Sequence, residues 1–289
     1  MCIRDRGEWV VLYDVASGEE TVLMQGSETV NIFPTLPAAD SYRPVLLDDG
    51  TVAFGYEVKA EQDQRYLYID GSGYPLDYRM FSDYFTDDAC ADFSITLAGP
   101  LIPAGEYFLG VFSVENLAGT FEVLLSGKEI EFPGFYMVAL IDKGGVGDVI
   151  WPPNLTWVGG KPTIETEFWI QLPQVFVAGN RVFAVAQDED GERRVYDLNA
   201  GAPLAGLSDW LARDIYAQPR GGWGADRIVQ VNEGLDMGLE DERASRYMIQ
   251  TFSLAAGSDR ILDTDLGQSD YWILTPDMEN LIGAKDDTG

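Results

Sequence analysis

One short pattern recurs along the chain: a strand of apolar or aromatic residues, then a polar turn that ends at glycine. Four copies cover 12–18, 67–73, 195–201 and 251–257, and a weaker copy covers 139–144. The final glycines of successive copies are separated by 55, 71, 57 and 56 residues. A repeat of this length accommodates four short antiparallel strands with their loops, so the pattern predicts a series of similar β-sheets.

The pattern is that of a β-hairpin. An alternating strand presents apolar side chains to a neighbouring sheet, and an Asx-Gly or Ser-Gly turn then leads into the outermost strand. A second pattern, a polar turn followed by an apolar strand, occurs at 49–54, 179–184 and 276–282. Helical periodicity is confined to one candidate at 208–218. We therefore predict an all-β fold made of propeller-like repeats.

The second pattern resembles the blades of TolB-type, WD-repeat-like β-propellers, in which a Pro-Asp-Gly turn precedes the inner strands of a blade. The copy at Pro276 and Asp277 departs from that family, because Met278 replaces the glycine. The resemblance covers about 7–30 and 176–289. It implies a propeller fold and says almost nothing about a ligand.

The interval of 71 residues breaks the period. Within it, the run Pro-Ala-Gly-Glu-Tyr at 103–107 resembles the small β-sandwich domains appended to secreted bacterial peptidases. We expect such a sandwich over 48–130, or else two irregular blades. The expected strands lie near 51–58, 65–70, 93–98, 105–114 and 119–125. The other expected segments are a partial blade at 7–47, a connecting segment or blade at 131–175, and truncated blades at 176–289.

The first six residues, Met-Cys-Ile-Arg-Asp-Arg, resemble a translated sequencing adaptor, and we expect 1–6 to be non-native. Without them Cys90 is the single cysteine, which we interpret as a small buried hydrophobe. On this interpretation the chain is a fragment, cut at both ends, of a larger bacterial protein. We expect that protein to be periplasmic or extracellular.

The charge balance limits the partners. There are 19 basic and 48 acidic side chains, which gives a net charge of −29. Such a chain lacks the cations that neutralise phosphates, so we expect no nucleic-acid partner. A peptide, a protein or a glycan fits this charge better. No apolar run approaches the roughly 18 residues of a membrane span, so we expect none.

Two groups of residues are candidate binding sites. Asp263, Asp265 and Asp270 surround a glycine with alternating carboxylates, the donor type that calcium requires. The loop lacks a third ligand before the glycine and a distal glutamate, so an inter-blade turn with solvated acids is the favoured interpretation. Trp223 stands between glycines, with little local strand support, and is a candidate ligand-binding residue on a loop.

The function predicted from these features is a non-catalytic binding or scaffolding module. The chain has no histidine, which excludes Ser-His-Asp and Cys-His systems, and it has no Gly-x-Ser-x-Gly nucleophile elbow. Two alternatives stay open. In the first, the chain is the substrate-gating propeller of a serine peptidase whose catalytic domain lies beyond residue 289. In the second, it is a glycosidase that uses two carboxylates about 5–9.5 Å apart.

Overall fold

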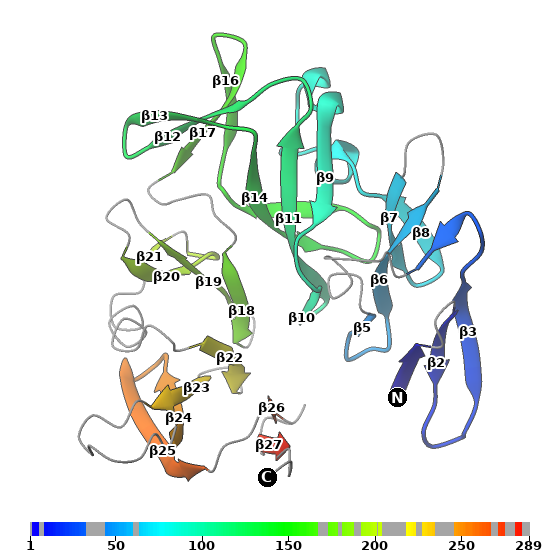
Figure 1. Cartoon of the computed structure of the whole chain (residues 1–289), viewed down its shortest axis with the longest axis vertical. Coiled ribbons are helices and arrows are strands. Elements are labelled where there is room, and N and C mark those ends of the chain that lie inside the picture. The colour runs from blue at the N-terminus through cyan, green and yellow to red at the C-terminus, as the bar shows by residue number, and fades with distance from the viewer. Residues whose placement is uncertain are drawn as a thin grey trace. The chain divides into compact units, whose positions relative to one another are not determined.

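The computed structural model is shown in Figure 1. It describes 2–5, 9–32, 44–59, 64–166, 173–178, 181–187, 192–200, 202–203, 218–223, 227–234, 246–266, 271–274 and 281–284. Beyond residue 200, side chains are described only at 252–257. The prediction of an all-β, propeller-like fold is confirmed, and none of the described sheets closes on itself. The helices of the described residues are two 3-10 segments, η2 (Tyr78–Phe81) and η3 (Asp88–Asp92).

The chain divides into two compact units, Met1–Pro173 and Gln174–Gly289. None of the helices among the residues placed by the structure has the length and apolar character needed to cross a bilayer. The predicted helix at 208–218 lies outside the described residues, apart from its last residue, which begins a strand.

The first unit begins with two antiparallel sheets. The β1–β3 sheet has the order β1-β2-β3, and the β4–β8 sheet has the order β4-β6-β7-β8, with β5 also pairing with β6. The residues expected to be non-native supply β1, which pairs with β2. The strands are β1 (Cys2–Asp5), β2 (Trp9–Tyr13), β3 (Glu20–Gln25), β4 (Val30–Asn31), β5 (Val45–Leu46), β6 (Val52–Val58), β7 (Gln64–Ile69) and β8 (Ser72–Pro75).

Two further sheets complete this unit. One has the order β10-β11-β14-β15, with β9 also pairing with β11, and the other has the order β13-β12-β17-β16. Strands β12 and β17 run parallel, although about forty residues separate them in the sequence. The strands are β9 (Phe93–Leu97), β10 (Ile102–Ala104), β11 (Tyr107–Asn116), β12 (Phe121–Leu125), β13 (Lys128–Phe132), β14 (Gly134–Ile141), β15 (Gly147–Trp151), β16 (Leu155–Val158) and β17 (Lys161–Thr166).

A strand lies at each position expected within 48–130, and the pairing shows which of these strands share a sheet. Strands β6 and β7 belong to the β4–β8 sheet, whereas the two sheets that face a common core run from 93 to 166. Alternation in the sequence marks where strands lie, whereas hydrogen bonding between distant segments decides which strands share a sheet.

The β4–β8 sheet is buried on both faces, as an inner blade of a stack would be. Ala53, Leu67 and Ile69 enter the large core of the unit. Val52, Phe54 and Tyr68 alternate with them and form a second core with Val10 of β2. Successive side chains of a strand point to opposite faces, so one run of apolar residues serves both cores.

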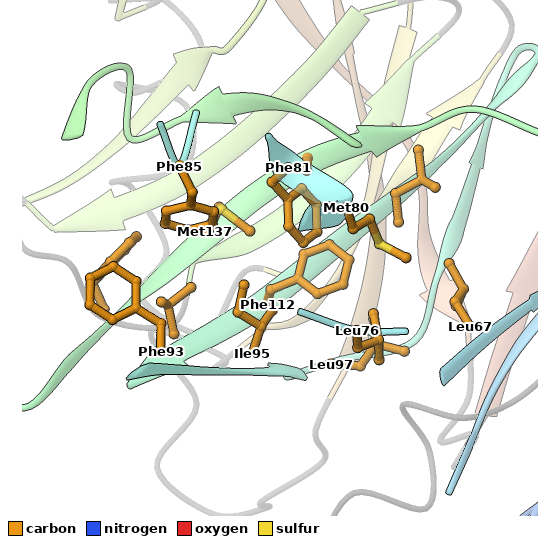
Figure 2. Packing of buried hydrophobic residues seen from close by; sticks show 14 of the residues in the cluster. Leu67, Leu76, Met80, Phe81, Phe85, Phe93, Ile95, Leu97, Phe112 and Met137 are labelled. Carbon is orange, nitrogen blue, oxygen red and sulfur yellow. The ribbon is translucent and has the colours of Figure 1, made fainter. Parts of the chain in front are cut away.

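The large core contains many aromatic rings, and part of it is shown in Figure 2. Phe81 of η2 packs edge-on against Phe112 of β11, with ring centroids 5.1 Å apart. Gly147 at the start of β15 allows this packing, because a Cβ there would lie 2.3 Å from the Phe81 ring. Cys90 is fully buried in the same core, as the sequence predicted.

The second unit contains two four-stranded antiparallel sheets in simple sequential order, β18-β19-β20-β21 and β22-β23-β24-β25, followed by the pair β26-β27. Phe252 of β24 packs into the core of the β18–β21 sheet. The strands are β18 (Gln174–Ala178), β19 (Arg181–Gln187), β20 (Arg193–Asp197), β21 (Ala202–Pro203), β22 (Gln218–Trp223), β23 (Arg227–Gly234), β24 (Arg246–Ser253), β25 (Ser258–Leu266), β26 (Tyr271–Leu274) and β27 (Leu281–Ala284).

The repeated pattern marks hairpins that lead into edge strands, as predicted. Its five copies connect β2 to β3, β7 to β8, β14 to β15, β20 to β21 and β24 to β25, and each second strand lies at the edge of its sheet. The polar residue at the start of the turn accepts backbone hydrogen bonds. Asp14 Oδ1 accepts from the amide of Ala16 at 2.8 Å, and Ser253 Oγ accepts from the amide of Ala256 at 3.1 Å.

Candidate ligand-binding surface

Four aromatic side chains form a row on one face of the β4–β8 sheet. Phe54 and Tyr56 alternate along β6, and Tyr66 and Tyr68 alternate along β7. The register places Phe54 opposite Tyr68 and Tyr56 opposite Tyr66. Both pairs are stacked, with ring centroids 4.4 Å and 5.2 Å apart and interplanar angles of 16° and 17°. Such cross-strand pairs stabilise a sheet and hold the rings in fixed orientations.

The row runs from the protein core to solvent. Phe54 is fully buried and Tyr68 is 6% exposed, whereas Tyr56 and Tyr66 are only half-buried. Partial burial raises the pKa of Tyr56, with a smaller contribution from Tyr66. Beyond them the exposed Gln64 accepts a hydrogen bond from the Tyr66 hydroxyl at 2.7 Å. The stacked tyrosines are therefore fixed by the sheet and also reach the surface.

Glycine in β8 lets Tyr56 lie across the sheet. A Cβ at Gly73 would come within 2.2 Å of the Tyr56 hydroxyl oxygen, so any larger residue would displace the ring. Gly73 lies opposite Tyr68 in the register of β7 and β8. The Tyr56 ring thus extends from β6 over β7 toward β8.

A fixed ion pair lies beside this end of the row. Strand β8 ends at Pro75, the cross-strand partner of Tyr66, and Asp77 follows as the N-cap of η2. Asp77 Oδ1 accepts from the Arg79 amide at 2.9 Å, and both carboxylate oxygens accept from Arg79 Nε at 3.1 and 3.0 Å. Asp77 also pairs with Arg79 Nη2. The guanidinium is exposed, yet its own turn determines its position.

The ionisation of Arg79 is determined mainly by its partner Asp77. Asp77 raises the pKa of Arg79, mainly by the hydrogen bond and then by charge, with smaller contributions from Tyr78 and Tyr66. The ion pair is neutral as a whole. We name Tyr56, Gln64, Tyr66, Asp77 and Arg79 the tyrosine surface; it offers two stacked rings, hydroxyl and amide groups, and a planar set of donors.

The tyrosine surface combines two kinds of group. Its rings provide an apolar contact area, and its polar groups give orientation, which is the usual composition of a ligand site. These residues were not among the sites predicted from the sequence. The available signal was the aromatic alternation at 54 and 56 and again at 66 and 68, which places all four rings on one face of a hairpin.

The predicted calcium residues are placed only in part. Asp263 and Asp265 lie in β25, where Asp263 is opposite Ile249 of β24, and Asp270 lies outside the described residues. The side chains of this region are not among those described, so calcium binding stays a prediction. Where side chains are described, no three Asp, Glu, Cys or His residues cluster in a way that could hold a metal ion.

Trp223 ends a strand instead of lying in a loop. It is the last residue of β22 and pairs with Arg227 of β23. A register shift between Pro219 and Gly221 lets this glycine-rich segment follow its partner. The side chain of Trp223 lies outside the described part of the chain, so its role in ligand binding stays a prediction.

Two groups that could take part in chemistry, the Cys90 thiol and the Asp197 carboxylate, are buried in the fold. Burial raises the pKa of the Cys90 thiol, which disfavours the nucleophilic thiolate. Asp197 is 3% exposed and accepts from Arg181 Nε at 3.0 Å. It also accepts from the amides of Asn199 and Ala200 at 3.0 and 3.2 Å, so the repeated turn accounts for this buried carboxylate.

Comparisons with known proteins give little further information. No protein-family model matches the chain, and no curated protein matches it. One similar solved structure is a putative dipeptidyl aminopeptidase IV from Bacteroides ovatus, with 9% identity and a TM-score of 0.41 over 88% of this chain and 34% of that one. Another is a puromycin-hydrolyzing peptidase from Mycobacterium tuberculosis, with 12% identity and a TM-score of 0.23 over 91% of this chain and 50% of that one.

The chain thus spans about one third and one half of the lengths of these two structures. Likeness at this level identifies neither an activity nor a ligand.

Proposed function

We propose that this chain is a non-catalytic binding or scaffolding module built from propeller-like sheets, and that its ligand docks on the tyrosine surface. The observation that carries the proposal is the solvent-reaching end of the aromatic row, where Tyr56 stacks on Tyr66 and where strand β8, which leads to Asp77 and Arg79, ends opposite Tyr66. Rings held in place by a sheet lose little freedom when a ligand binds, which favours affinity. A peptide, protein or glycan ligand and an extracytoplasmic location remain part of this proposal.

The proposal is tested with immobilised oligosaccharide and peptide arrays probed with the full chain. Tyr66→Ala removes one ring of the stack, and Tyr66→Phe keeps the ring and removes the hydroxyl. Tyr107→Ala is the matched control, because Tyr107 is a 38% exposed tyrosine on β11, outside the tyrosine surface. We expect Tyr66→Ala to abolish the array signals and Tyr107→Ala to preserve them. Array profiles that are the same for the wild type and Tyr66→Ala would contradict the proposal.

A turnover assay tests directly whether this chain is itself catalytic, as the glycosidase alternative requires. The full chain is incubated with a panel of aryl glycosides and with dipeptide p-nitroanilides. A binding module gives no release above the blank with either panel. Release of aryl glycoside aglycone would establish the carboxylate-dependent glycosidase instead, and release of p-nitroaniline would establish a peptidase activity within this chain.

A further inference from the structure

The chemistry of the tyrosine surface narrows the class of ligand, provided that the proposed binding function holds. We infer that the tyrosine surface binds a neutral oligosaccharide. Three features of the described residues favour such a ligand: the charge balance at the surface, its hydrogen-bonding groups, and the form of the neighbouring sheet edge.

The charge balance favours an uncharged ligand. The guanidinium of Arg79 is the cation of the surface, and Asp77 neutralises it through hydrogen bonds from Nε at 3.0 and 3.1 Å. The chain as a whole carries −29, which repels polyanions approaching from solution. An acidic polysaccharide would meet neither a free cation nor a favourable long-range field here.

The hydrogen-bonding groups match a polyhydroxyl ligand. Arg79 has five N–H donors, and its bonds to Asp77 involve Nε and Nη2, so Nη1 has no hydrogen bond to another described residue. Gln64 holds the Tyr66 hydroxyl with its carbonyl oxygen, which leaves its NH₂ group as a donor. A pyranose ring has an apolar C–H face that can lie on an aromatic ring, and its rim of hydroxyls reaches such planar polar groups.

The neighbouring edge disfavours a peptide bound by strand addition. Strand β8 is the edge of its sheet, spans only Ser72–Pro75, and ends at a proline that has no N–H to offer. Short edge strands that contain proline resist pairing with another chain. The tyrosine surface therefore gives an extended peptide few backbone partners, whereas a saccharide requires none.

Calorimetric titration of the full chain tests this inference. The probes are cellohexaose, laminarihexaose, mannohexaose and xylohexaose, with hexagalacturonate as the anionic probe and a proline-rich decapeptide as the peptide probe. We expect at least one neutral hexaose to bind, and Tyr66→Ala to weaken it about tenfold or more. Arg79→Lys keeps the charge but loses the planar donors and should also weaken it, whereas Tyr107→Ala should have no effect.

A charge variant adds an independent readout. Asp77→Asn keeps an oxygen that can cap η2 but leaves Arg79 unneutralised, so hexagalacturonate should gain affinity relative to the wild type. The inference would be overturned if the wild type preferred hexagalacturonate. It would also be overturned if Tyr66→Ala and Arg79→Lys both bound the neutral hexaoses as tightly as the wild type does. Peptide binding that depends on Tyr66 would overturn the saccharide inference and leave the proposed binding function standing. If no probe depends on Tyr66, both fail.

Discussion

Replacing Asp197 tests how the repeated turn holds a sheet together. Its buried carboxylate accepts hydrogen bonds from two turn amides at 3.0 and 3.2 Å and from Arg181 Nε at 3.0 Å. Asp197→Ala leaves both amides without their acceptor and Arg181 without its partner. Each lost hydrogen bond is worth about 1 kcal/mol, and the charged one is worth more. We therefore expect Asp197→Ala to lower the free energy of unfolding by about 2–4 kcal/mol. Asp197→Asn keeps an acceptor oxygen for the turn and should cost about 1–2 kcal/mol.

Hydrogen exchange measured by mass spectrometry on peptides that cover 181–200 provides a local assay, which does not require the two units to unfold together. The matched control is Asp14→Ala, because Asp14 occupies the same position of the repeated turn but is exposed. We expect strong deprotection of 181–200 in Asp197→Ala and only local deprotection around the first turn in Asp14→Ala. The reasoning would be refuted if the two alanine variants deprotected their segments equally. It would also be refuted if Asp197→Asn deprotected 181–200 as strongly as Asp197→Ala.

Three further predictions concern packing and charge. Gly147→Ala should cost about 1–3 kcal/mol in urea unfolding, because its Cβ would lie 2.3 Å from a buried ring, whereas Gly99→Ala meets nothing within 4 Å and should be near neutral. The hydrogen bond from Lys143, and then that from the Thr51 amide, lowers the pKa of Asp49 to about 2. This ion pair should therefore stabilise the fold above pH ~4 and lose its effect as the pH falls toward 2, and Lys143→Met should raise the pKa of Asp49 in an NMR titration. With a net charge of −29, the melting temperature should rise with sodium chloride as repulsion is screened. A further rise with calcium at matched ionic strength, lost in Asp263→Ala, would establish the calcium site, and no rise with sodium chloride would contradict the repulsion argument.

The repeated turns were predictable because their causes are local. Asp14 and Ser253 accept hydrogen bonds from amides two and three residues ahead, so a window of seven residues contains the whole motif. The grouping of strands was not predictable in this way. The parallel pairing of β12 with β17 joins Glu122 to Thr163, and nothing within either strand identifies the other.

The tyrosine surface shows the same division between local and distant causes. The alternation of Tyr66 and Tyr68 is visible in the sequence and places both rings on one face. The register of the β6–β7 hairpin determines that Tyr56 lies opposite Tyr66. The approach of the Tyr56 ring to Gly73 depends on β8 as well. A sequence pattern could therefore predict a row of rings, but not which end of the row reaches solvent.

The aromatic row of the β4–β8 sheet differs from the stacked pair of the β18–β21 sheet in what lies over its rings. The β18–β21 sheet has an equivalent cross-strand pair, Phe176 opposite Phe183, stacked at 5.2 Å. There the guanidinium of Arg181 lies 5.1 Å from the Phe183 ring centroid and is held by the buried Asp197. That sheet covers its ring with its own cation, whereas in the β4–β8 sheet the cation is held by Asp77 beside the rings. A half-buried stack that its own cation does not cover is consistent with the binding role proposed above; a stack covered by its own ion pair contributes stability instead.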